Sequence, residues 1–347
     1  MLRILLLTSA FVLTIAVVAG ARTWHVRADS TGDAPTIQAA IDSASGGDSV
    51  LVAEGLYEEE VVLGPNIVLL GGWDAAFERR DPTGYVTQVS ASGSSAHPVQ
   101  VNTGCEIDGF HVTAYGYHSA AFYCYDVYYG PPEARITNNV ITGEGVGIYC
   151  RGTSPHIEGN LIKGCGFHPN IYGGGIWCTY DASPTIRRNL IVGNDDNGIY
   201  AEFDSSPTIE NNTIVDTYWD PNEPWRARGD GIHSHYGASP IVRNNIIAGN
   251  RFGVVHTFEG GPVLSCNDIW GNALGSYDGC GPGPTDIHEC PSFCNAGFGD
   301  YHLCDQSPCL PGGNPCGRLI GAYGGGCSCG PSRTEPTTWG AIKAMYR

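Results

Sequence analysis

The chain is poor in basic residues. Of its 347 residues only 18 are Lys or Arg, against 35 Asp and Glu, so the formal net charge at pH 7 is −17. A surface without a basic surplus cannot bind nucleic acid by neutralising phosphates, and anionic lipid headgroups repel it. The shortage of Lys and Arg therefore excludes nucleic acid as a partner and leaves cations and neutral ligands.

Charged helix formers and catalytic signatures are scarce as well. Only 15% of the residues are charged, whereas Gly (49) and Pro (22) are abundant, a composition typical of short strands joined by tight turns. With 42% hydrophobic residues the chain can still bury a core. The sequence contains no P-loop, nucleophile elbow or His-Glu-x-x-His motif, so any chemistry must be sought in the fold.

The one long apolar run lies at the N-terminus. Arg3 precedes an apolar segment (residues 4–19), and residues 19–21 form a small-residue cleavage site. Because the run is short for a membrane span, residues 1–21 are predicted to be a signal peptide, with no membrane insertion after its removal. We expect the mature protein to be secreted or at the cell surface, where disulfides persist.

A short motif recurs along the chain. Six segments share the pattern Pro/Ala-x-Ile-x-x-Asn-x-Ile, with Val or Leu as the first apolar residue in the last two. Their shared residues are Asn139, Asn160, Asn189, Asn212, Asn245 and Asn267. A seventh, degenerate copy carries Phe110 in the Asn position. Such self-similarity predicts a solenoid, in which each coil buries its apolar face against the next.

The shared Asn has a structural explanation. It lies between two strands only a few residues apart, where the chain must bend sharply, and Asn tolerates the left-handed backbone that such a bend needs. Its amide can also donate to the same Asn one coil away. We therefore interpret the six Asn as a ladder of hydrogen bonds and not as a ligand site.

Between the Asn motifs a second element, Gly-Ile-x-x, recurs. Side chains alternate along a strand, so the residue two positions after the Ile is expected to face inward with it. This places Cys124, Cys150 and Cys178 in the core as a stack of small hydrophobic side chains. The residues predicted to face solvent are Tyr123, Tyr149, Trp177, Tyr200, His233 and Val255, followed two positions on by Tyr125, Arg151, Thr179, Glu202, His235 and Thr257.

These two motifs resemble the right-handed parallel β-helix repeat of the pectin-lyase-like superfamily. The N-terminal stretch agrees, because residues 35–41 followed by residues 47–52 are similar to that family's capping helix and first strand, with Thr36 as the helix N-cap. Residues 71–74 and 80–82 are also similar to secreted bacterial members.

The resemblance implies an all-β fold, a right-handed parallel β-helix of roughly eight to nine coils with an N-terminal capping helix near residues 36–45. The expected organisation is a signal peptide (1–21), a parallel β-helix (22–272), a Cys-rich C-terminal cap (273–330), and a linker with a short tail (331–347). We expect a monomer. The resemblance does not fix an activity, because this fold carries lyases, hydrolases, epimerases, adhesins and inert stalks alike.

Cysteines concentrate near the C-terminus. Nine of the 14 are Cys266, Cys280, Cys290, Cys294, Cys304, Cys309, Cys316, Cys327 and Cys329. They lie in a Gly/Pro-rich region that cannot pack a core by itself, so we expect disulfides to hold it together. A zinc site at Cys290-x-x-x-Cys294 is the alternative, and it lacks a second matching pair. The sequence leaves the disulfide connectivity open.

The outward rings predict a binding groove. Five ring side chains in consecutive coils form a row suited to the apolar faces of sugars, although β-propensity and neighbour stacking alone are an alternative explanation. Long insertions enter the same face, and insertions in solenoids usually map to the binding face. In the resembled enzymes the active groove lies on the corresponding face. The residues expected to contact a polysaccharide or cell-surface glycan are Tyr123, Tyr149, Trp177, Tyr200, His233, Trp219, Trp225, Arg226 and Arg228.

Catalysis has less support in the sequence. The candidate acid–base residues are Glu202, Asp230, His233, His235 and Arg151. A lyase usually needs Ca²⁺ held by several outward carboxylates, and these are few here, so no cofactor is firmly implied, Ca²⁺ is the one candidate, and no metal ligand is assigned. We interpret the chain as a polysaccharide-binding protein. The alternative is a polysaccharide lyase or glycoside hydrolase acting on an acidic polysaccharide in the same groove.

Overall fold

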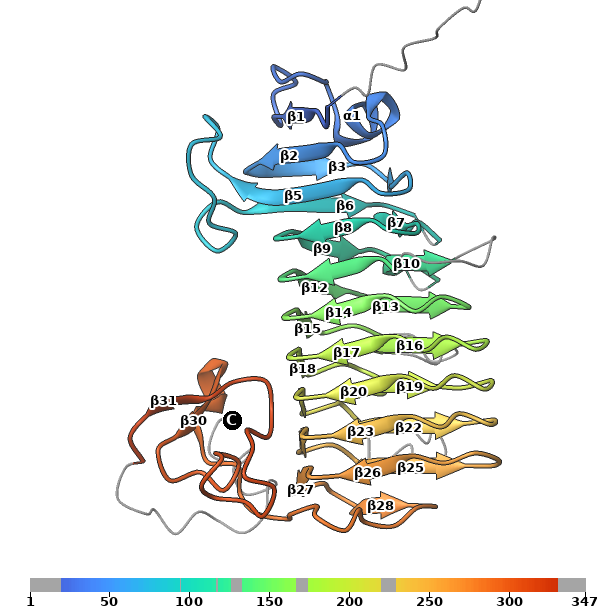
Figure 1. Ribbon diagram of the computed structural model, residues 1–347, viewed down its shortest axis with the longest axis vertical. Helices are drawn as coiled ribbons and strands as arrows, with labels where there is room; N and C mark the ends of the chain where they lie inside the picture. Colours follow the sequence, from blue (N-terminus) through green and yellow to red (C-terminus); the bar gives the residue numbers. More distant parts are fainter. Residues whose placement is uncertain are drawn as a thin grey trace, which may run out of the picture.

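The protein is a solenoid of short parallel strands, drawn upright in Figure 1. The computed structural model describes residues 20–93, 95–116, 118–125, 133–166, 174–219 and 229–329. Most of the predicted signal peptide and all of the predicted linker and tail lie outside these residues. The parallel β-helix predicted from the repeats is confirmed.

Three long parallel sheets run the length of the solenoid. Sheet A contains β1 (Thr23–Val26), β2 (Ser49–Ala53), β5 (Val68–Trp73), β8 (Glu106–Asp108), β11 (Arg135–Thr137), β14 (His156–Glu158), β17 (Thr185–Arg187), β20 (Thr208–Glu210), β23 (Ile241–Arg243) and β26 (Val263–Ser265). Sheet B contains β3 (Gly55–Glu58), β6 (Thr87–Ala91), β9 (His111–Ala114), β12 (Val140–Gly143), β15 (Leu161–Lys163), β18 (Leu190–Val192), β21 (Thr213–Val215), β24 (Ile246–Ala248) and β27 (Asp268–Trp270). Sheet C contains β4 (Val61–Val62), β7 (Val99–Val101), β10 (Ala120–Tyr125), β13 (Val146–Arg151), β16 (Ile176–Thr179), β19 (Ile199–Ala201), β22 (Ile232–His235), β25 (Phe252–Thr257) and β28 (Gly275–Asp278).

The N-terminal coil is closed by α1 (Ile37–Ser43), as predicted. The Thr36 hydroxyl accepts a hydrogen bond from Ala39 N at 3.1 Å, and the Glu59 carboxylate accepts from Ile37 N and Gln38 N. These contacts satisfy amide groups that the first helical turn leaves unpaired.

The interior is filled by columns of side chains from successive coils. In sheet C the inward column is Ile148, Ile176, Ile199, Ile232 and Val254, all fully buried. The predicted thiol stack is also present, because Cys124 pairs in register with Cys150, and Cys150 with Cys178, all inside the core. Each buried Ile contributes about 1.5–3 kcal/mol of hydrophobic stabilisation, which a lone strand of three residues could not gain.

The Asn ladder is formed as expected. The Oδ1 atom of Asn189 accepts from the backbone N and from the Nδ2 of Asn160, at 2.9 and 3.0 Å. Its own Nδ2 donates to Ile157 O and to Asn212 Oδ1. Each rung therefore satisfies the backbone at the bend and passes a hydrogen bond to the next coil, fully shielded from water.

The ladder has defined ends. At the N-terminal end Phe110 occupies the Asn position, as the degenerate motif indicates, and its backbone N donates to Asn139 Oδ1. At the other end the last Asn, Asn267, donates from N and Nδ2 to a carboxylate oxygen of Asp286, a residue that the motif did not identify.

The Cys-rich region folds back beside the solenoid and does not extend it (Figure 1). It contains β29 (Phe293–Asn295), a short 3₁₀ helix (Ala296–Phe298), β30 (Asp300–Cys304) and β31 (Gly325–Cys327). Disulfides join Cys266 to Cys316, Cys294 to Cys327, and Cys304 to Cys329.

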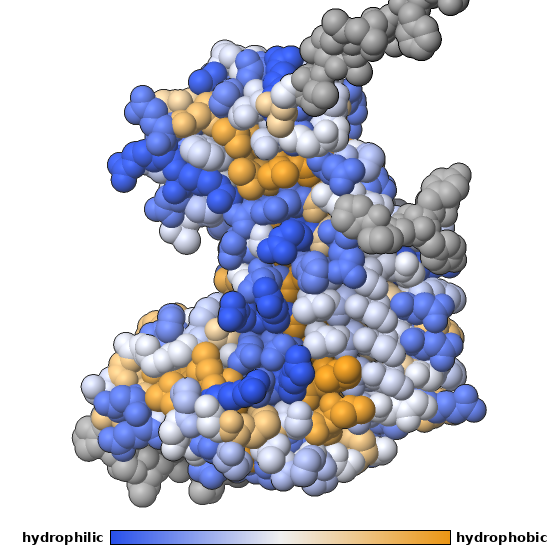
Figure 2. All heavy atoms as spheres, viewed as in Figure 1, coloured by the Kyte–Doolittle hydropathy of each residue, from blue (hydrophilic) through white to orange (hydrophobic). Residues whose placement is uncertain are grey.

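This region covers part of the outer face of sheet B. Leu190, Val215, Ile246 and Ala248 of sheet B form one buried apolar cluster with Tyr301, Leu303, Cys309 and Ile320 of the C-terminal region. Figure 2 shows that the molecular surface is hollowed between this region and the N-terminal coils.

We expect Asn189→Ala to lower the free energy of unfolding by about 2–5 kcal/mol, because it leaves several buried hydrogen-bonding groups without a partner. Urea denaturation monitored by circular dichroism measures the change. Thr185→Ala, on the outer face of the same coil, should change it by no more than about 0.5 kcal/mol. Equal effects of the two substitutions would show that the ladder contributes little to stability.

Candidate functional site

The outer face of sheet C carries a continuous column of rings, in the register predicted from the sequence. Tyr123 pairs with Tyr149, Tyr149 with Trp177, Trp177 with Tyr200, and Tyr200 with His233. We call these five residues, together with His97, the ring column. The strand residues on either side of them are buried and mostly apolar, so alternation along each strand separates ring from core.

The rings contact one another throughout. The centroid separations are 4.2 Å for His97–Tyr123, 5.4 Å for Tyr123–Tyr149, 5.0 Å for Tyr149–Trp177, 6.1 Å for Trp177–Tyr200 and 5.4 Å for Tyr200–His233. His97, Tyr123 and Tyr149 are stacked in parallel, whereas Trp177 is turned by 78° from Tyr149 and by 56° from Tyr200. The indole is therefore not sandwiched between parallel neighbours.

Four residues of this face are more enclosed than predicted. Tyr200, Val255, Thr179 and Glu202 were expected to face solvent, but they are only 4%, 2%, 0% and 7% exposed. All four alternate with the core residues along their strands, so the register is right. Their neighbours cover them, because a column of rings at coil spacing leaves little open surface between members.

Glu202 lies at the centre of this face and is 7% exposed. Its Oε1 accepts hydrogen bonds from Trp177 Nε1 at 3.0 Å and from the Thr179 hydroxyl at 3.2 Å, and its Oε2 accepts from the Tyr200 hydroxyl at 3.2 Å. Burial raises the pKa of Glu202 above its ordinary value, although these hydrogen bonds and the nearby His233 act in the opposite direction. The result is a carboxyl group held among rings with an increased tendency to keep its proton.

Asp230 forms the second polar centre. It is fully buried, and its carboxylate accepts hydrogen bonds from Nε and Nη2 of Arg251 at 2.9 and 3.0 Å. Its Oδ2 also lies 3.1 Å from Nδ1 of His233. The other ring nitrogen of His233 lies 3.2 Å from the Thr257 hydroxyl. Asp230 thus fixes the orientation of the imidazole, while Arg251 compensates its charge.

Four of the five catalytic candidates lie together, and one does not. Glu202, Asp230, His233 and His235 occupy neighbouring coils, and the His233 and His235 ring centroids are 5.9 Å apart. Burial, followed by His233 and His256, lowers the pKa of His235. Arg151 lies on β13, two coils from Glu202, where its guanidinium is 4.6 Å from the Tyr180 ring and 5.6 Å from the Tyr125 ring.

A second row of rings, not predicted from the sequence, lies beside the ring column. Tyr180, Phe203, Tyr236 and Phe258 follow the sheet C strands at the turn toward sheet A, and we call them the turn ladder. Their ring planes lie within 20° of parallel, with centroids 5.1, 5.3 and 5.0 Å apart. They are 37% to 69% exposed. The signal was an aromatic residue recurring in four successive coils, three positions after Trp177, Tyr200, His233 and Val255.

The longest insertion, which follows β21, lies partly within the described residues. Trp219 is half-buried, and its Cβ lies close to Gly229, which leads directly into Asp230. Trp225, Arg226 and Arg228 lie outside the described residues, so their predicted contribution to the groove stays a prediction.

Comparison with known proteins gives one family. The family model described as "Periplasmic copper-binding protein (NosD)" matches residues 98–281, which include most of sheet C, the turn ladder and the ring column except His97. The periplasmic location in that description agrees with the extracytoplasmic location predicted here. No helix among the described residues is long and apolar enough to cross a membrane. A search of the curated proteins finds no match.

Two solved structures are similar in fold. The crystal structure of pectate lyase Pel9A is 13% identical with a TM-score of 0.48, over 89% of this chain and 97% of that one. The alginate lyase from Paenibacillus sp. str. FPU-7 is 13% identical with a TM-score of 0.36, over 78% of this chain and 98% of that one.

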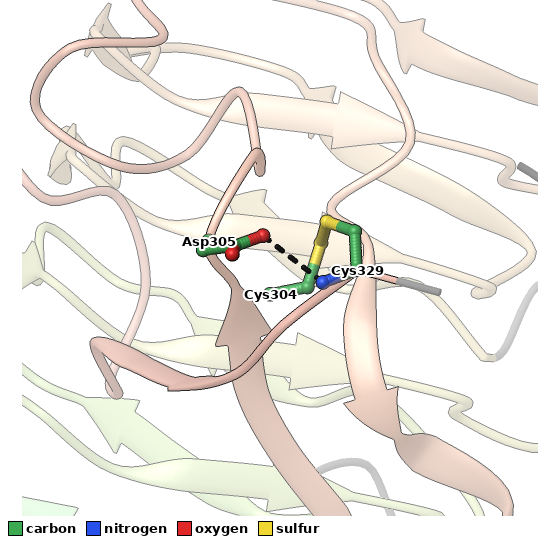
Figure 3. A group of neighbouring side chains, drawn as sticks. All are labelled: Cys304, Asp305 and Cys329. Carbon is green, nitrogen blue, oxygen red and sulfur yellow. Dashed lines mark hydrogen bonds between the residues drawn. A yellow bond between two sulfur atoms is a disulfide. The ribbon is translucent and has the colours of Figure 1, made fainter. Parts of the chain in front are cut away.

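The described residues do not fit a copper site. Among them, one group brings three His, Cys, Asp or Glu donor atoms close enough to share an ion, namely Cys304, Asp305 and Cys329 (Figure 3). Its two sulfurs are joined in a disulfide, and Asp305 accepts from Cys329 N at 3.0 Å. A disulfide does not offer the thiolates that copper takes as ligands. His233 and His235 direct their Nδ1 atoms at Asp230 and Thr257.

We expect Glu202→Gln to remove a pH dependence of stability. The folded state raises the pKa of Glu202 above the unfolded value of 4.5. The protonated Glu202 therefore stabilises the fold fully below pH 4.5, and this stabilisation is lost as the pH rises through the folded-state pKa. Gln has no carboxyl to ionise, so the variant should be at least as stable as the wild type at pH 7 and should gain nothing from acid, whereas the wild type does. Thermal unfolding between pH 4 and 8 measures the difference.

The matched control is Glu259→Gln, which alters an exposed carboxylate. Its melting temperature should stay close to that of the wild type, because an exposed side chain has few contacts to lose. If Glu202→Gln behaves in the same way, the Glu202 carboxyl is not the buried group that the structure describes.

Proposed function

The chain belongs to the NosD family, and from that premise we propose that it is an extracytoplasmic β-helix protein that binds polysaccharide along the outer face of sheet C. The family's name also includes copper, but the described residues offer that metal no prepared site. What they do offer is a row of rings with hydrogen-bonding groups beside it. Such a combination suits sugars, whose apolar faces stack on rings and whose hydroxyls need polar partners.

The observation that carries the proposal is the environment of Trp177. Its indole is half-buried, is not stacked in parallel on either neighbour, and has its Nε1 held by Glu202. A ring fixed in this way contacts a ligand at little cost in conformational entropy. Tyr149 and Tyr123 continue the row of rings through the two preceding coils, so the site repeats in the direction in which a polymer would lie.

A second candidate function is hydrolysis of the bound polysaccharide. The observation that favours it is the raised pKa of Glu202, since a carboxyl group among rings that retains its proton suits a general acid. His233, oriented by Asp230, is the basic group whose charge acts on the pKa of Glu202. This candidate requires that Glu202 be reached from solvent through the ring column.

Hydrolysis is tested by incubating the full chain with neutral polysaccharides and measuring new reducing ends. A hydrolase should generate them, and Glu202→Gln should lower the rate at least about 100-fold, the usual contribution of a general acid. An unchanged rate in Glu202→Gln, or no reducing ends from any substrate, removes the enzymatic candidate and leaves the binding function.

Trp177→Ala is expected to weaken polysaccharide binding by about 1–3 kcal/mol and to leave the fold intact, because the residue faces outward. Ile176→Ala, its inward neighbour, should lower the free energy of unfolding by about 2–5 kcal/mol through a cavity, with unchanged affinity in the folded fraction. Isothermal titration calorimetry and urea denaturation measure the two effects separately.

Trp177→Phe is the intermediate case, because it keeps an aromatic face and loses the hydrogen bond to Glu202. We expect it to retain part of the affinity. If Trp177→Ala binds as the wild type does, the ring column is a packing feature of the solenoid and the proposed function is wrong.

A further inference from the structure

The turn ladder has a backbone that its residue types do not favour. Tyr180, Phe203, Tyr236 and Phe258 have φ values of 54°, 47°, 41° and 69°, all in the left-handed region. Bulky side chains are uncommon there, and Gly, Asn or Asp would occupy the same turn with less strain. At each of the four positions an exposed ring therefore stands where a small polar residue would be more stable.

The turn ladder and the ring column flank a third column, with Arg151, Thr179, Glu202, His235 and Thr257 in successive coils, and we call the strip of surface between them the trough. Thr179 and Glu202 are buried, whereas the neighbouring Tyr180 and Phe203 are exposed, so at these two coils the middle column is recessed relative to the turn ladder. The trough runs parallel to the solenoid axis.

His235 connects the two walls. Its ring centroid is 6.4 Å from that of Tyr200 in the ring column, and 3.7 Å and 5.0 Å from those of Tyr236 and Phe258 in the turn ladder. The aromatic surface is therefore continuous across the floor at this point. A ligand lying in the trough would contact both walls.

The rings of the turn ladder present their edges to solvent. Neighbouring rings stack in parallel at about one coil spacing, so they cover one another's faces. Phe258, at the end of the row and 69% exposed, is the exception, because no further ladder ring covers its outer face. Ring edges carry partial positive charge and contact oxygen atoms favourably. Tyr180 and Tyr236 add hydroxyl groups, so this wall suits sugar oxygens.

The charges along the trough are mostly negative. Asp181, Asp204 and Glu259 follow three of the four ladder residues and are exposed. Arg151 is the one Lys or Arg in the described part of the three columns, and its guanidinium is already engaged with the Tyr125 and Tyr180 rings. An anionic polymer would therefore meet repulsion at three of the four coils.

We propose that this trough binds a polysaccharide that carries no uronate carboxylates, lying along the solenoid axis between the ring column and the turn ladder. The inference rests on the proposed function and adds the class of polysaccharide and the second wall of the site. The proposed ligand differs from the acidic polysaccharide suggested by the sequence, because the exposed carboxylates that border the site would repel uronates.

The experiment compares hexasaccharides of three classes by isothermal titration calorimetry on the full chain: uncharged (cellohexaose), amine-bearing (hexaglucosamine) and uronate (hexagalacturonate). We expect the uncharged or the amine-bearing class to bind at least about tenfold more tightly than the uronate at low salt. Uronate binding equal to or tighter than both overturns the inference and leaves the proposed function standing. No binding of any class overturns both.

Variants separate the turn ladder from general effects on the fold. Asn tolerates a positive φ, so the double variant Phe203→Asn, Tyr236→Asn removes two rings without straining the turn. It should weaken binding about tenfold without lowering the melting temperature. Wild-type affinity in this variant, together with a loss in Trp177→Ala, restricts the site to the ring column and overturns the second wall.

A second double variant, Asp181→Asn, Asp204→Asn, tests the charge argument. Removing the two carboxylates should strengthen uronate binding several-fold and leave the affinity for cellohexaose unchanged. High salt should have the same effect on the wild type, because screening weakens repulsion between exposed charges. If uronate affinity does not respond to either change, electrostatic exclusion is wrong.

Discussion

Hydrogen bonding from one coil to the next is the interaction on which the whole structure depends. Most strands of the three sheets have three or four residues, too few to form a stable sheet or to bury an apolar face alone. Stacking supplies both requirements at once, because each strand pairs with its neighbours in parallel and each Ile packs on the Ile of the next coil. The Asn ladder extends this pairing through the sharp bend between sheets A and B, where the backbone would otherwise leave buried groups unsatisfied.

The same stacking produces the candidate site. A residue type that recurs at one position of the repeat becomes a column in space, so six rings far apart in the sequence lie in contact along sheet C. Columns of opposite character can then be adjacent, as the recessed Thr179 and Glu202 are to the exposed Tyr180 and Phe203. A trough formed in this way needs no large loop, and it is as rigid as the sheet that carries it.

Much of this could be predicted from the sequence, because the repeat fixes the register. The inward Cys124, Cys150 and Cys178, the outward ring column and the Asn ladder all follow from the period-two alternation and the recurring motif. The enclosure of Tyr200 and Val255 did not follow, since alternation gives the direction of a side chain and not what its neighbours cover. The turn ladder was missed because turns are expected to carry small polar residues. The three disulfides depend on a fold-back that no motif in the C-terminal region encodes.

The last rung of the Asn ladder has a consequence for the size of the solenoid. An Asn both accepts and donates, so a ladder of Asn can be continued indefinitely by a further coil. Asp286 accepts from Asn267, and its other oxygen is occupied by the Tyr277 hydroxyl and by Gly283 N. In all of these hydrogen bonds Asp286 is the acceptor, and it donates to no further coil. The ladder of side-chain hydrogen bonds thus has a polarity and a terminus, and a further coil, whether from this chain or from a second molecule, could add to the solenoid only through the strands and not through the ladder.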